Sequence, residues 1–196
     1  MSPKQQRGEA TAAHVLDCAL DLYASDGEAG LTLGALTSAS GVSAGSIYHH
    51  FGSLPGVVAA LAQSWLGRLL DELGGELARA GNARTGIHAV VRTYLTFIQV
   101  HPDAARLMHS ATVDRETTAR ARQIRGAQEA RLAPLAAWLR AHQESGQLVD
   151  LPLPVVESLI LGPVTGIARR WLSVGDIDIE EAARTVPERI WRSVSP

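Results

Sequence analysis

Hydroxyl and imidazole side chains gather between Leu31 and Phe51, in the sequence LTLGALTSASGVSAGSIYHHF. Thr32 and Ser43 each precede a short segment with apolar spacing, where a hydroxyl can accept a hydrogen bond from the first turn of a helix. Gly41 lies between the two segments, at the place where a sharp turn needs a positive φ. The stretch therefore predicts a helix-turn-helix, whose second helix would enter the major groove of DNA.

The charge around this stretch is unusual for a DNA-binding module. Residues 1–56 hold two basic side chains against five acidic ones, a net charge of -3, whereas phosphate neutralisation normally supplies most non-specific affinity. All five acids precede Leu31, so the helix-turn-helix has only His49, His50 and Tyr48 as titratable groups. We expect weak non-specific binding to DNA.

Residues 1–8 contain Pro3 and Gly8 and show no periodicity, which predicts a mobile arm. Its basic residues, Lys4 and Arg7, could reach phosphates or a minor groove. The alternative is a frayed, solvated terminus.

Composition favours a folded chain without catalytic chemistry. The 196 residues are 46% apolar, enough for a substantial core, and the net charge is only -2. Cys18 cannot form an internal disulfide and is interpreted as a buried structural thiol. Neither a signal peptide nor a membrane-spanning run is present, so a cytoplasmic protein is expected. Nucleophile elbows, phosphate loops and Cys-His sets are absent, so we expect no catalytic residue, no metal and no cofactor.

Apolar residues recur at helical spacing through most of the chain, and no segment alternates like a strand, so the fold class is all-α with about nine helices. After an arm, the spacing predicts helices over 9–25, 32–40, 43–51, from 54 past 77, 87–100, from 102, 117–145, 155–172 and 179–194. Loops are expected at 26–30 and 81–86, and the last helix is expected to follow Asp178.

Five arginines near the start of the 117–145 helix face only two acids: Arg115, Arg120, Arg122, Arg125 and Arg131. They could bind an anionic ligand. The alternative is a solvated face whose guanidinium stems cover apolar surface.

The last two predicted helices suit a seam between two copies of the chain, because they are apolar on more than one face and their glycines permit close backbone approach. Proline should bend or interrupt each of them, at Pro163 and Pro187. The residues expected at the seam are Leu159, Gly162, Pro163, Gly166, Ile167, Trp171, Ala183, Val186 and Ile190.

The sequence GVSAGSIYHHFGS, preceded by LTLGALTSAS and by a helix ending near Tyr23, resembles the N-terminal domain of TetR-family transcriptional regulators. The match covers about the first 60 residues, and the long helices that follow resemble the family's second domain. The resemblance implies a DNA-binding domain over 1–56 and a ligand-binding and dimerisation domain over 57–196. It further implies a homodimer that binds a palindromic operator in double-stranded DNA and lets go when a small molecule enters each C-terminal domain.

Carried onto this chain, the resemblance implies phosphate contacts from Thr32, Ser43, Tyr48 and His49 or His50. Base contacts would come from Ala44, Gly45 and Ser46, which read sequence only weakly, so Thr37, the arm and DNA shape would add specificity.

Two departures from the family's pattern leave an alternative function open. Leu54 stands where many members have a phosphate-binding lysine, and Leu33 and Gly34 stand where many have polar or basic residues. The alternative is an all-α small-molecule-binding dimer with weak or lost DNA binding.

An effector pocket is expected within the C-terminal domain, mostly apolar and with few donors. Its expected lining is Trp65, Leu69, Val91, Tyr94, Leu95, Met108, Trp138 and His142. The last two are four residues apart and could line a pocket together, or could be interior packing and a surface ring. An apolar or aromatic effector that releases a repressor from DNA follows from this interpretation.

Overall fold

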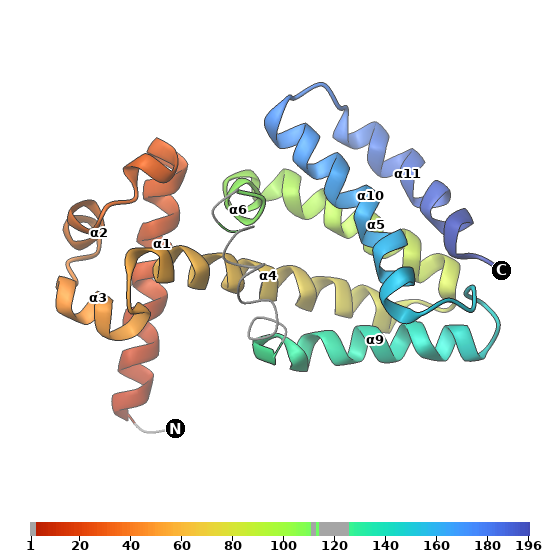
Figure 1. Cartoon of the computed structure of the whole chain (residues 1–196), viewed down its shortest axis with the longest axis horizontal. Coiled ribbons are helices and arrows are strands. Elements are labelled where there is room, and N and C mark those ends of the chain that lie inside the picture. The colour runs from red at the N-terminus through yellow and green to blue at the C-terminus, as the bar shows by residue number, and fades with distance from the viewer. Residues whose placement is uncertain (1–2, 111–112, 114–125) are drawn as a thin grey trace. The chain divides into compact units, whose positions relative to one another are not determined.

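The computed structural model describes residues 3–110, 113 and 126–196, with side chains from residue 6 onward. Within these ranges the chain forms nine α-helices and no strand (Figure 1), which confirms the all-α prediction. The described residues divide into two compact units. The first contains residues 3–65, 107–110 and 113, and the second contains residues 66–106 and 126–196.

In the first unit, α1 (Pro3–Gly30) packs against α2 (Leu33–Ser40) and α3 (Ala44–Phe51). Figure 1 shows α1 in red, with the orange helices α2 and α3 beside it. Its core is made of small and branched apolar side chains that are fully buried: Val15, Ala19, Leu36, Ile47 and Val57. Val57 belongs to α4 (Leu54–Arg79), which begins where Ser53 Oγ accepts a hydrogen bond from Gly56 N (3.1 Å). The predicted helix-turn-helix segments are confirmed.

The N-terminal prediction is wrong in two respects. Residues from Pro3 to Gly8 belong to α1, because proline is well placed in a first helical turn and one glycine among Gln, Arg and Glu is too weak a helix breaker. Cys18 is part-exposed on α1 instead of buried, while Val15 takes the interior position. The expected break after Ser25 does occur, at Gly27, where φ is 64°.

The second unit contains the rest of α4, then α5 (Ala83–Val100), most of α6 (Pro102–Met108), α9 (Glu129–Glu144), α10 (Leu153–Ser173) and α11 (Ile179–Val194). α5 packs against both α10 and α11, and α10 also packs against α9 (Figure 1). The predicted start of the 117–145 helix, with Arg115, Arg120, Arg122 and Arg125, lies outside the described residues. Its described part ends at Glu144, as expected.

Capping side chains set the ends of two of these helices. Asp178 Oδ1 accepts hydrogen bonds from the amides of Glu180 and Glu181 (both 2.9 Å), so Asp178 caps α11, which begins at Ile179 as predicted. Asn82 and Thr85 form a reciprocal capping box, so α5 begins at Ala83 and the loop predicted over 81–86 is wrong.

Neither internal proline interrupts its helix. α10 continues past Pro163 to Ser173, and α11 continues past Pro187 to Val194. A proline removes one backbone hydrogen bond, and burial of Val164 and Ala168 in α10 and of Pro187 itself in α11 holds the following turns in place.

Candidate DNA-binding surface and ligand cavity

Two hydroxyl caps and one glycine build the turn between α2 and α3. Thr32 Oγ1 accepts a hydrogen bond from Ala35 N (3.1 Å), and Ser43 Oγ accepts one from Ser46 N (3.3 Å). Gly41 adopts φ 66° and ψ 6°, and its amide donates to the Thr37 carbonyl (3.0 Å). A side chain at Gly41 would strain this left-handed conformation.

The second helix of the motif is anchored by one face only. Ile47 of α3 and Leu36 of α2 are completely buried, whereas Tyr48 remains 45% exposed and His49 and His50 are also exposed. A Cβ built on Gly45 would meet nothing within 4 Å. Within the first unit, no other protein segment covers the exposed face of α3. This face is therefore accessible to a large ligand such as a DNA duplex.

The residues expected to contact DNA fall on this exposed side to different degrees. Thr32, Ser43 and Gly45 are exposed, while Ala44 and Ser46 are half-buried. Thr37 is half-buried as well, and its hydroxyl donates to the Gly34 carbonyl (2.9 Å). Since that donor is already used, Thr37 can only accept hydrogen bonds from a base or a bound water.

The basic residues assigned to an arm lie instead on the first turns of α1. Arg7 is exposed there, and its carbonyl accepts a hydrogen bond from Thr11 Oγ1 (2.9 Å). The side chain of Lys4 lies outside the described part. His50 comes near this end of α1, because a Cβ built on Gly8 would lie 3.6 Å from His50 Cε1.

No group of three His, Cys, Asp or Glu residues within the described ranges could hold a metal ion. The rings of His49 and His50 meet edge to face with centroids 5.5 Å apart.

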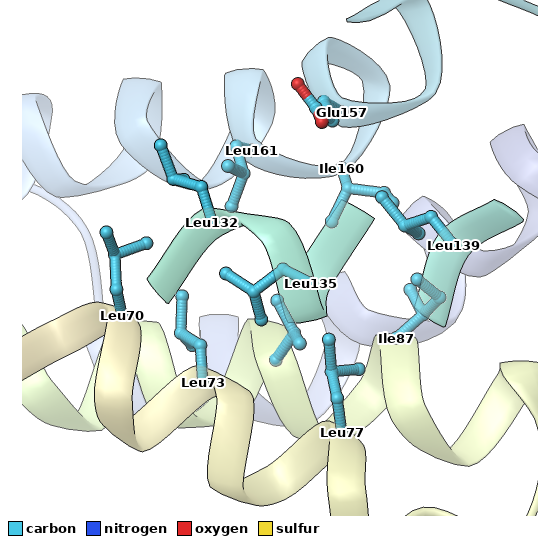
Figure 2. A pocket seen from close by; sticks show the side chains of 11 residues that line it. Leu70, Leu73, Leu77, Ile87, Leu132, Leu135, Leu139, Glu157, Ile160 and Leu161 are labelled. Carbon is cyan, nitrogen blue, oxygen red and sulfur yellow. The ribbon is translucent and has the colours of Figure 1, made fainter. Parts of the chain in front are cut away.

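An apolar cavity of about 110 Å³ lies inside the second unit. Figure 2 shows aliphatic side chains of α4, α5, α9 and α10 converging on it. Each helix contributes residues at i, i+3, i+4 or i+7 spacing, so one face of each helix is turned inward. The lining is Leu70, Leu73, Leu77, Ile87, Val90, Leu132, Leu135, Leu139, Glu157, Ile160 and Leu161.

None of the eight residues predicted for a ligand site lines this cavity. Leu69, Val91, Tyr94 and Leu95 are buried on neighbouring helical faces, and burial raises the pKa of Tyr94 to about 12. Trp65 is buried and Met108 is half-buried. On each helix, more apolar residues are buried than line the cavity. The sequence pattern indicates which residues are buried, but it does not indicate which of them line the cavity.

Trp138 and His142 are packing partners away from the cavity. Their ring centroids are 3.9 Å apart, and Nδ1–H of His142 donates to the Trp138 carbonyl (2.8 Å). Sequence reasoning missed all the lining residues, although the 70, 73, 77 spacing and a single acid within the apolar 155–172 segment were visible signals.

Part of the predicted dimer seam is available on the protomer surface. Gly162, Pro163 and Gly166 are exposed on α10. Half-exposed apolar residues accompany them on α10 and α11: Leu159, Ile167, Trp171, Ala183 and Val186. Ile190 is a correction, because it is 3% exposed and packs inside its own protomer.

Helices long and apolar enough to cross a membrane do not occur among the described residues.

Comparison with known proteins identifies the first unit. Residues 15–61 match the sequence model described as "Bacterial regulatory proteins, tetR family". No curated protein matches the chain.

Solved structures share the fold over nearly the whole chain. A TetR family transcription regulator from Marinobacter aquaeolei VT8 has a TM-score of 0.73 at 19% identity, covering 97% of this chain and 98% of that one. The fatty acid degradation regulator FadR from Bacillus halodurans has a TM-score of 0.74 at 19% identity, covering 97% and 96%. FadR from Bacillus subtilis, solved in complex with stearoyl-CoA, has a TM-score of 0.72 at 15% identity, covering 91% and 96%. The chain therefore carries the N-terminal domain of the tetR family of bacterial regulatory proteins and has the all-α fold of TetR-family transcription regulators.

Proposed function

We propose that this protein is a ligand-responsive transcriptional repressor that binds a palindromic operator as a homodimer and is released by a small, mostly apolar effector. The observation that carries the proposal is the capped helix-turn-helix, in which α3 is anchored through Ile47 and leaves Tyr48 and its neighbours exposed. That arrangement is what insertion into a major groove requires.

Phosphate contacts are assigned to the hydroxyls of Thr32, Ser43 and Tyr48 and to an imidazole of His49 or His50. The starts of α2 and α3 favour anions, since orphan amides and the helix dipole act together there. Both cap hydroxyls accept bonds from their own helices, so each can still donate its proton to a phosphate oxygen.

Base contacts are assigned to Ala44, Gly45 and Ser46 at the first turn of α3. Ala44 can touch only a thymine methyl, and Ser46 bonds either kind of base. Arg7 and Lys4, at the start of α1, add phosphate or minor-groove contacts.

The homodimer is assigned to the exposed faces of α10 and α11, without Ile190. Small residues at Gly162 and Gly166 would let two helices approach closely. Since a twofold dimer presents two copies of α3, the operator should contain two half-sites about one turn of duplex apart.

The apolar cavity of the second unit is assigned to the effector. FadR from Bacillus subtilis is complexed with stearoyl-CoA, which supports a ligand-binding role for the same fold. Release follows if the effector binds the DNA-free conformation better, because a coupling free energy between two sites is reciprocal. The residues in the cavity wall offer binding groups and no nucleophile with a partnered base, so the proposal includes no enzymatic activity. A DNA target also implies the cytoplasm.

A second function is favoured by specific residues. Leu54, Gly34 and the net charge of -3 over residues 1–56 suit an all-α small-molecule-binding dimer that has weak or lost DNA binding.

The test is fluorescence polarisation of a labelled duplex from the region upstream of the protein's own gene, at low salt, with a scrambled duplex as control. Saturable binding that prefers the upstream duplex supports the repressor. No binding at micromolar protein rejects it in favour of the second function.

A further inference from the structure

The cavity of the second unit has one charged side chain among the described residues of its wall. Ten of its lining residues are Leu, Ile or Val, and the eleventh is Glu157. Glu157 lies three and four residues before Ile160 and Leu161, so all three share one face of α10 (Figure 2). A ligand in this cavity would meet hydrocarbon side chains from all four helices and a carboxylate at α10.

Glu157 differs from the other half-buried acids among the described residues of this unit. Glu76 pairs with Arg79, Asp103 with Arg106 (2.8 Å) and Glu188 with Arg84 (2.9 Å). Within the same ranges no hydrogen bond or ion pair engages the Glu157 carboxylate. The remaining unpaired acids of the unit are fully exposed and can be solvated by bulk water.

A carboxylate in an otherwise apolar wall is complemented best by a hydrogen-bond donor or a cation. Among the described lining residues, no Lys, Arg or His supplies one. A second anion there, such as the carboxylate of a fatty acid, would be repelled by Glu157. The ligand that complements this wall therefore carries a cationic donor.

We propose that the effector of this protein is a small apolar amine whose hydrocarbon part fills the cavity and whose protonated nitrogen bonds to Glu157. This inference rests on the proposed function, which makes the cavity the effector site. A cavity of about 110 Å³ is smaller than the roughly 150 Å³ leucine-lined cavity that holds benzene, so the hydrocarbon group should be no larger than a benzene ring.

The experiment compares three probes that share a ring and differ in head group: benzylamine, benzyl alcohol and benzoate. Their binding to the full chain is measured by calorimetry at about neutral pH, where amine and carboxylates are charged. We expect the amine to bind about tenfold more tightly than the alcohol, the difference between a charge-assisted and a neutral hydrogen bond, and benzoate to bind most weakly.

Two variants isolate the carboxylate. Glu157→Gln keeps the shape and removes the charge, so its affinity for benzylamine should fall about tenfold to that of benzyl alcohol. Glu144→Gln changes an exposed acid of α9 and should leave all three affinities unchanged. The order of the probes on the unaltered protein is informative even if Glu157→Gln folds poorly.

The outcomes of this experiment distinguish the amine-effector proposal from the proposed repressor function. If benzoate binds as tightly as benzylamine, or if Glu157→Gln keeps the preference for the amine, the amine proposal is overturned and an apolar effector site can remain. Failure of all three probes to bind overturns the cavity as an effector site together with the amine. If the protein fails to bind DNA but binds benzylamine more tightly than benzyl alcohol and benzoate most weakly, the repressor proposal is contradicted and the amine proposal is supported.

Discussion

The indole of Trp138 on α9 occupies the space beside Gly86 on α5: a Cβ built on Gly86 would lie 2.3 Å from Trp138 Cζ2 and 2.5 Å from Cη2. Real Cβ atoms do not approach other atoms so closely, so glycine is needed here for a close approach between two helices. The indole cannot simply swing away, because it is stacked on His142 with centroids 3.9 Å apart.

Gly86→Ala should destabilise the protein, even though alanine is the better helix former. Overpacking of a fixed ring costs about 1–3 kcal/mol, which outweighs the gain of about 1 kcal/mol in helix propensity. Urea unfolding measures the change. Gly75→Ala is the matched control, since its new Cβ would contact only the flexible end of Arg79, at 3.6 Å, and stability should rise. Equal effects of the two substitutions would contradict the packing argument.

The stability of the second unit should depend on pH through His88. Burial, and then the charge of Arg92, lower the pKa of His88, while Glu188 Oε2 lies only 3.2 Å from its Nε2. Arg84 also faces the ring, and it and Arg192 bind Glu188 and lower the pKa of that carboxyl. Glu188 therefore stays charged while His88 titrates.

The sign follows from proton binding. Because the folded protein binds a proton at His88 less readily than the unfolded chain, stability is lost as pH falls below about 6.5, the ordinary pKa of histidine. Urea unfolding at about pH 7.5 and pH 5.5 should show this loss, and His88→Gln should reduce it. His49→Gln, at an exposed ring, should leave the loss unchanged, and a loss unaltered by His88→Gln would assign it to another group.

Local chemistry explains what could be predicted from the sequence. Thr32, Ser43 and Asp178 cap helices through bonds to amides two or three residues away, so the signal and its effect lie within one turn. Gly41 and Gly27 adopt positive φ, which glycine allows because it has no Cβ, so this signal also lies in a single residue. The family-specific turn lies in the same short stretch, which is why the fold class and the helix-turn-helix could be predicted together.

The cavity could not be predicted in the same way. Neighbouring residues such as Leu69 and Leu70, or Val90 and Val91, are all buried, and which member of a pair faces the cavity depends on how α4, α5, α9 and α10 pack. Helical periodicity distinguishes buried from exposed residues, but it does not distinguish buried residues that line a cavity from those packed against other side chains. The prolines of α10 and α11 show the same limit, since tertiary packing overrides their local effect.

The proposed DNA binding should depend weakly on salt concentration. Residues 1–56 offer only Lys4 and Arg7 in each of two protomers, and each phosphate neutralised contributes about -0.9 to the slope of log K against log salt. We expect a slope no steeper than about -4 in polarisation titrations at several salt concentrations, at a pH where histidine is neutral. A slope of about -8 would mean that cations outside this region contact the phosphates.

The Tyr48 hydroxyl should contribute to DNA affinity without contributing to stability. Its side chain is 45% exposed, so Tyr48→Phe removes a phosphate donor and leaves the core unchanged. The dimer loses two such contacts at about fivefold each, so affinity should fall about 25-fold on matched and scrambled duplexes alike, because a phosphate contact carries no sequence information. Tyr23→Phe on α1 is the matched control and should bind as tightly as the unaltered protein. Unchanged binding by Tyr48→Phe would remove this residue from the interface.

The position of the cavity can be tested with two leucines of the same helix. Leu69 and Leu73 are 3% and 4% exposed on α4, but only Leu73 lines the cavity. Either substitution by alanine should cost about 2–5 kcal/mol of unfolding free energy, because both remove equally buried side chains. Only Leu73→Ala enlarges the cavity, so only this variant should bind a larger probe, such as naphthylmethanol, more tightly than the unaltered protein does in calorimetry. If Leu69→Ala gains this affinity instead, the ligand space lies on the face that the sequence pattern indicated.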